Sequence, residues 1–93
     1  DWLVGLKDRR AAAKILVRVS RMKAGNHGDV KPASKGVSEA RIDYGPGYRI
    51  YFATRGKALI VLLVGGDKSN QGKDIKAAKA MWEAWKEENN DED

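Results

Sequence analysis

The chain has 93 residues and no cysteine, so we expect one domain, residues 1–93, without disulfides or thiolate metal sites. No apolar run approaches the roughly 20 residues of a membrane-spanning helix, and we expect a protein of the reducing cytoplasm that does not enter a membrane. The net charge is +5, but 18 cations and only eight acids precede residue 87, and this basic body fits either polyanion binding or a solvated surface.

The first part of the chain is predicted to be helical. A short apolar pattern over residues 2–6 is followed by Asp8, a suitable N-cap for a helix over residues 9–24 that stops at Gly25. We expect these two helices to form a helical hairpin packed on a sheet. The apolar stripe of the second helix consists of Ala12, Ile15, Leu16, Val19 and Met22, and six cations occupy its remaining arc.

Residues 25–36 are predicted to be a loop because turn-forming residues dominate them. The loop carries Lys31, Lys35 and the one histidine, His27. A histidine beside glycines is either a general base near neutral pH or an exposed loop residue. The two lysines lie close in sequence to the strands that follow.

A β-hairpin is predicted over residues 37–54, with strands at 37–43 and 48–54 and a Gly-Pro-Gly turn between them. Closing it symmetrically places Asp43 opposite Arg49 and Arg41 opposite Tyr51, all on one face of the sheet. A third strand follows at 58–64, apolar on both faces and therefore expected to be central and covered. The predicted sheet is a three-stranded antiparallel meander.

A second polar loop at 65–74 precedes the last helix, which we expect to run from Asp74, as N-cap, to residue 88. Trp82 and Trp85 lie three residues apart on it, and we expect them to pack against the protein rather than to stack on bases. Residues 89–93 are predicted to be a frayed acidic tail.

The candidate site is the cationic face of the hairpin, because an arginine can make two hydrogen bonds to the oxygens of one phosphate and lysine adds a point charge. RNA cleavage by its own 2′-hydroxyl needs alignment, a base, an acid and charge stabilisation, and no metal or cofactor. One histidine and scattered carboxylates do not form a metal site. The alternative is a salt-bridged face on which Asp43 and Glu39 neutralise Arg41 and Arg49.

Four segments, residues 5–10, 25–32, 36–52 and 65–69, resemble in order and spacing the HigB-like addiction module killer proteins. These are toxins of the RelE/ParE superfamily of type II toxin–antitoxin systems. The resemblance implies an α+β fold with helices on one side of a twisted antiparallel sheet. It also implies a cognate helix-turn-helix antitoxin, HigA-like. Family members begin with additional residues that include a first β-strand, which we expect to be missing from this chain.

The resemblance further implies an mRNA endoribonuclease that acts on the ribosome and inhibits translation. Arg49 matches the superfamily arginine that contacts the scissile phosphate, Arg41 a basic strand residue, and Lys68 a further cation. Substrate contacts are expected from Lys31, Lys35, Tyr48 and Tyr51. The chain has no tyrosine or histidine beyond Tyr51, where RelE-type ribonucleases often carry one. The alternatives are a ParE-like inhibitor of DNA gyrase without nuclease chemistry and an inactive antitoxin-binding module.

Overall fold

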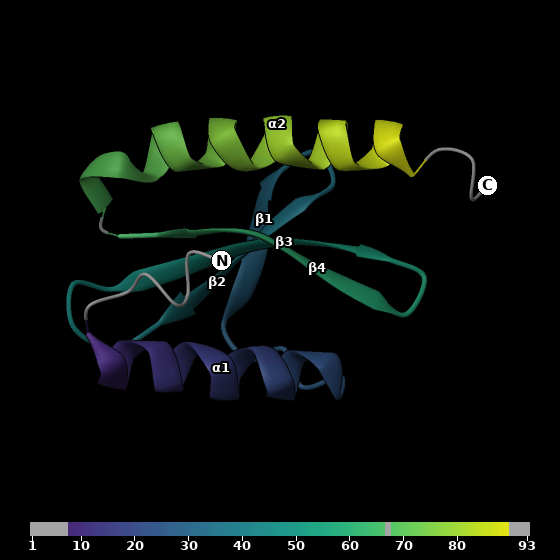
Figure 1. Ribbon diagram of the computed structural model, residues 1–93. Coiled ribbons are helices and arrows are strands. Elements are labelled where there is room, and N and C mark those ends of the chain that lie inside the picture. The colour runs from purple at the N-terminus through teal and green to yellow at the C-terminus, as the bar shows by residue number, and fades with distance from the viewer. Residues whose placement is uncertain (1–7, 67, 90–93) are drawn as a thin grey trace.

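The computed structural model describes residues 8–66 and 68–89 and has an α+β fold. Its two helices lie on opposite sides of one antiparallel sheet (Figure 1). Neither described helix has the length and apolar character needed to span a bilayer. The predicted helix at 2–6 falls outside the described residues. The elements in chain order are α1 (Arg9–Lys23), β1 (Val30–Ser34), β2 (Val37–Ile42), β3 (Tyr48–Arg55), β4 (Ala58–Gly65), a 3-10 helix η1 (Lys68–Asn70) and α2 (Gln71–Glu88).

The predicted helices at 9–24 and 74–88 are confirmed as α1 and α2, but only the start of α1 was predicted correctly. The Asp8 carboxylate accepts hydrogen bonds from the backbone N–H groups of Arg10 and Ala11, so it caps α1 as predicted. The predicted cap of α2 is wrong, because α2 begins at Gln71 and places Asp74 inside its first turn. At the other end, Asn89 caps α2 rather than fraying, and donates a side-chain hydrogen bond to the Trp85 carbonyl.

Among the described residues, the sheet has four strands in the order β1-β2-β3-β4. The prediction of a loop over residues 25–36 missed β1, whose sequence Val-Lys-Pro-Ala-Ser contains few strong strand formers. Pro32 is tolerated because β1 lies at an edge among the described strands, where a missing backbone donor costs little. Pairing with β2 therefore makes this segment a strand, against its local preference.

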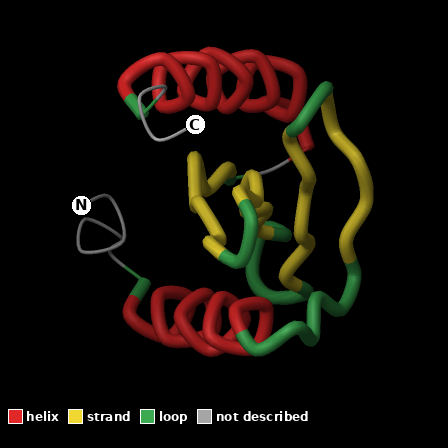
Figure 2. Tube along the Cα trace, turned by 90° about the vertical axis from the view of Figure 1, so that its right-hand side faces the viewer, coloured by secondary structure: helices red, strands yellow, loops and turns green. Residues whose placement is uncertain are grey.

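The third predicted strand, β4, is not central. Among the described strands it lies at the other edge of the sheet, and most of its residues are half-buried. It is apolar on both faces because the sheet is covered by α1 on one face and α2 on the other (Figure 2). The continuous apolar sequence of β4 thus indicated that helices cover both faces of the sheet. It did not indicate where the strand lies within the sheet.

Each helix has its own apolar core. On the α1 face, Ile15 and Met22 pack with the alternate strand residues Ala40, Ile42, Ile50 and Phe52. On the α2 face, Ala78 and Trp82 pack with Val37, Tyr51, Ala53 and Leu62. The expectation from the resemblance that the helices pack on one side of the sheet is therefore wrong for the described residues. The apolar stripe predicted for α1 holds except at Leu16, which is 56% exposed.

The hairpin closes two residues away from the symmetric register. Ile42 pairs with Tyr48, so residues 43–47 form the connection and Asp43 leaves the strand. Gly45 and Gly47 accommodate this turn with φ of 58° and 80°, values that other residues rarely adopt. A shift of two residues keeps every side chain on its predicted face, but it changes all the partners.

Candidate phosphate-binding site

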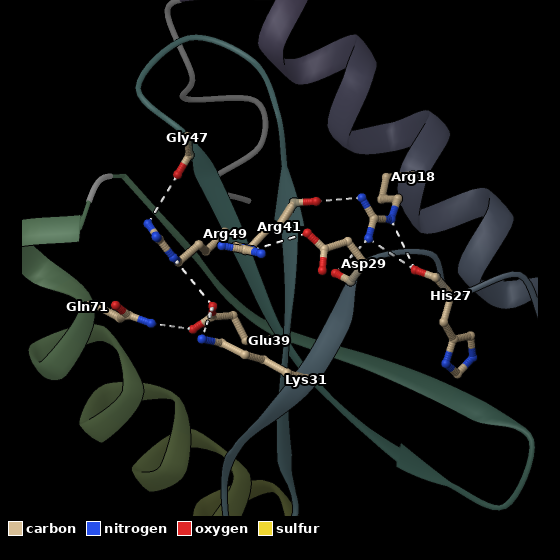
Figure 3. Close-up of polar contacts among 9 residues, drawn as sticks. All are labelled: Arg18, His27, Asp29, Lys31, Glu39, Arg41, Gly47, Arg49 and Gln71. Atoms are coloured by element: carbon tan, nitrogen blue, oxygen red, sulfur yellow. Dashed lines mark hydrogen bonds and ion pairs between the residues drawn. The ribbon is translucent and has the colours of Figure 1, made fainter.

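Two arginines stand opposite each other beside the turn of the β2–β3 hairpin. Arg41 and Arg49 are direct cross-strand partners, so their side chains leave the same face of the sheet. Like charges in this position destabilise a sheet, and each arginine has an acidic partner. Arg41 Nε lies 3.1 Å from Asp29 Oδ2, and Arg49 Nε lies 3.4 Å from Glu39 Oε2 (Figure 3). The two cations are therefore held in place by the fold.

The Arg49 pair is buried beneath α2. Glu39 is fully buried, and the Arg49 side chain is 7% exposed. Gln71, the first residue of α2, donates a hydrogen bond of 2.8 Å from Nε2 to Glu39 Oε1, and Lys31 Nζ lies 3.9 Å from Oε2. The contact between Arg49 Nε and Glu39 Oε2 lacks hydrogen-bond geometry, so it acts as an ion pair. Glu39 thus links β1, β3 and the start of α2.

Tyr51 lies next to this pair, because it is the cross-strand partner of Glu39. It is fully buried, and its hydroxyl has no hydrogen-bond partner among the described residues. Burial, followed by the negative charges of Glu39 and Asp74, raises the pKa of Tyr51 to about 12. The ring packs against α2, so it offers no stacking face to a substrate in this structure.

The Arg41 pair is open to solvent and is positioned by a third arginine. Arg18 of α1 donates from Nε and Nη2 to the carbonyl of His27, from Nη2 to that of Asp29, and from Nη1 to that of Arg41. These contacts fasten α1 to β2 and to the segment that enters β1. Arg18 contributes charge to the site, but its donors are already engaged by the backbone.

A hollow of about 520 Å³, the arginine hollow, lies in front of these groups. Arg49 Nη1 donates to the Gly47 carbonyl at 3.3 Å. Arg49 Nη2 and both terminal nitrogens of Arg41 have no partner among the described residues. Guanidinium N–H groups without a hydrogen-bond partner at one hollow can bind a phosphate in a bidentate manner. The lining residues are Arg18, Asp29, Arg41, Ile42, Asp43, Gly47, Tyr48 and Arg49.

Two carboxylates also line the arginine hollow. Asp29 is engaged by Arg41, whereas Asp43 is exposed and has no ion pair or side-chain hydrogen bond among the described residues. Asp43 is therefore the carboxylate of this hollow that remains available to accept a proton. Within the described ranges, no group of three potential ligands is placed to hold a metal ion.

A protein of Haemophilus influenzae, described as an uncharacterized protein, is 51% identical to this chain over 81 residues. The match covers 87% of this chain and 82% of that protein. The two proteins belong to one family. No family model and no solved structure matches the chain.

In this member of the family, the structure brings together only some of the predicted site residues. Arg41, Arg49 and Tyr48 line the arginine hollow, and Lys31 turns toward Glu39. Lys35 lies in the turn between β1 and β2 and does not line the hollow. Lys68 begins η1, and its side chain falls outside what the structure describes.

The histidine also lies apart from the arginines. Figure 3 shows the His27 side chain directed away from them. Its ring meets Phe52 edge-on, with centroids 6.1 Å apart, and it lines a different hollow with Lys23 and Lys57. It is therefore the backbone carbonyl of His27, through Arg18, that serves the site.

Sequence reasoning missed Asp29 and Gln71. It placed Arg18 only among the six cations of the helix arc, which could bind phosphate or be solvated, and it assigned Glu39 only as a neutralising charge. Glu39 gave one usable signal, since it lies two residues from Arg41 and therefore on the same face of the strand as the arginines. The other three have no local signal, because their partners lie nine to 32 residues away in the chain.

Proposed function

We propose that this protein is the toxin of a type II toxin–antitoxin system and cleaves mRNA on the ribosome. In this proposal a helix-turn-helix antitoxin neutralises it. One observation carries the proposal: Arg41 and Arg49 are held face to face with free guanidinium donors at a single hollow. Preorganised cations of this kind stabilise the charge that develops on a phosphate during cleavage.

The chemistry assigned to the chain is limited to its own residues. Asp43 accepts the proton of the RNA 2′-hydroxyl, whose oxygen then forms a bond to the adjacent phosphorus. The bond from phosphorus to the 5′-oxygen breaks, and that oxygen takes a proton from water. Arg41 and Arg49 stabilise the charge on the phosphate oxygens throughout this exchange.

The test is transcript mapping after induction of the chain without antitoxin. Arg41→Ala is the informative variant, because the Arg41 side chain is 50% exposed and its loss leaves no buried charge. We expect new mRNA 5′ ends in translated regions with the wild type and their loss with Arg41→Ala. Lys79→Ala, an exposed cation of α2, is the matched control. Undiminished cleavage by a folded Arg41→Ala protein would refute the proposal.

A second candidate is inhibition of DNA gyrase without nuclease chemistry. The observation that favours it is the lining of the arginine hollow, whose described residues include no histidine or lysine. A site of cations and one free carboxylate is better suited to binding than to moving two protons. This candidate predicts trapped gyrase–DNA complexes with intact transcripts. An inactive antitoxin-binding module predicts normal growth in the same experiment.

A further inference from the structure

A second hollow adjoins the arginine hollow, on the side of α1. It measures about 360 Å³, and we call it the α1 hollow. The two hollows share Arg18, Ile42 and Asp43 as a common wall, so a ligand in one can continue into the other. The residues that only the α1 hollow contributes are Ala13, Lys14, Val17 and Arg21.

The α1 hollow is strongly cationic. Helix α1 carries six lysines and arginines and no acid over its 15 residues. Arg21 is exposed and has no side-chain partner among the described residues, and Lys14 Nζ rests 5.2 Å from the centre of the Tyr44 ring. Neither cation is engaged by a carboxylate, so both can bind an incoming anion. Arg18, by contrast, has its donors on backbone carbonyls.

We propose that the α1 hollow is a second phosphate subsite, which binds a neighbouring phosphate of the same RNA strand through Lys14 and Arg21. This inference rests on the proposed function, because it takes the arginine hollow as the place of the reacting phosphate. Asp43 stands on the common wall and repels phosphate, so it separates the two anion positions. A strand held on both sides of Asp43 presents its sugar, and not a phosphate, to the carboxylate.

The apolar residues on α1 raise the competing possibility of an acidic protein segment as the ligand. Leu16 and Val17 are 56% and 51% exposed. Leu16 does not line the α1 hollow, however, and the α1 hollow shares Arg18, Ile42 and Asp43 with the arginine hollow. Continuity with the arginines therefore favours one RNA strand over a separate protein ligand.

The experiment measures binding of a nine-nucleotide RNA by fluorescence anisotropy, with 2′-O-methyl groups that prevent cleavage. The test variant is Lys14→Ala/Arg21→Ala. Its control is Lys76→Ala/Lys79→Ala, which removes two exposed cations of α2 on the far side of the sheet. Each lost contact to single-stranded nucleic acid lowers the salt slope of log K by about 0.7. Two lost contacts lower the slope by about 1.4. Relative to the wild type, the variant should therefore lose roughly 25-fold more affinity at 0.1 M salt than at 1 M salt.

A dinucleotide with one bridging phosphate, titrated by NMR, completes the test. We expect Lys14→Ala/Arg21→Ala to leave its affinity unchanged, and Arg41→Ala to weaken it. If Arg41→Ala weakens both ligands and the α1 variant weakens neither, the subsite is refuted while the proposed function stands. If Arg41→Ala affects neither ligand, the arginine hollow is not the phosphate site and both proposals fall.

Discussion

The buried charge pair between Glu39 and Arg49 predicts a large and specific stability effect. Glu39→Gln keeps the shape of the side chain and removes its charge, which leaves the Arg49 guanidinium buried without a counter-charge. At 3.4 Å and an effective dielectric constant of about 20, the attraction between two unit charges is about 5 kcal/mol. Breaking a buried pair on one side costs about 3–5 kcal/mol in other proteins.

We expect the lower end of this range, a loss of about 3 kcal/mol in the free energy of unfolding. Arg49 keeps its hydrogen bond to the Gly47 carbonyl, and its outer nitrogen faces the arginine hollow, where water can solvate it. The loss is measured by urea unfolding, followed by the fluorescence of the tryptophans, with an unchanged dependence on urea concentration.

Asp29→Asn is the matched control, because it makes the same chemical change in the exposed pair with Arg41. The two side chains of that pair are 50% and 61% exposed, so we expect a loss below about 1 kcal/mol. Equal effects of Glu39→Gln and Asp29→Asn would show that burial of the Glu39 pair does not matter, and would refute the reasoning. Glu39→Gln/Arg49→Met should recover most of the loss, since it removes the unpaired charge as well.

Three further changes test local features by urea unfolding. Burial raises the pKa of Tyr51 in the folded state, so its contribution to stability is present well below pH 10 and falls by about 2 kcal/mol as the pH rises from 10 to 12. Tyr51→Phe should be close to neutral at pH 7 and should remove this decline. Gly36 has a φ of 78°, and a Cβ there would lie 2.8 Å from Trp82 Nε1, so Gly36→Ala should cost about 2 kcal/mol or more, whereas Gly56→Ala, in open space, should cost only the backbone strain of about 1 kcal/mol. Asp8→Ala removes the N-cap of α1 and should cost about 1 kcal/mol; no loss would show that the cap does not stabilise this helix.

The antiparallel hairpin shows how far local pattern reaches. The Gly-Pro-Gly turn and the alternation of residues on either side of it correctly predicted β2 and β3, and they placed Arg41 and Arg49 on one face of the sheet. That placement survived a two-residue change of register because side chains in a strand repeat every second residue. The predicted cross-strand partners were wrong, because the register depends on the conformation of the five-residue turn, which local sequence patterns do not determine.

The sequence by itself therefore determined both described α-helices, three of the four described strands, the cationic character of α1 and the face that carries both arginines. Only the tertiary structure decided that β1 is a strand, that α2 buries the polar face of β3, and that Glu39 and Asp29 divide the two arginines into a buried and an exposed pair. Capping, turn chemistry and periodicity act between neighbours in the chain, so they can be read locally. Burial of Glu39 and Tyr51 and the contacts of Arg18 arise from segments far apart in sequence, which meet only when the two helices close on the sheet.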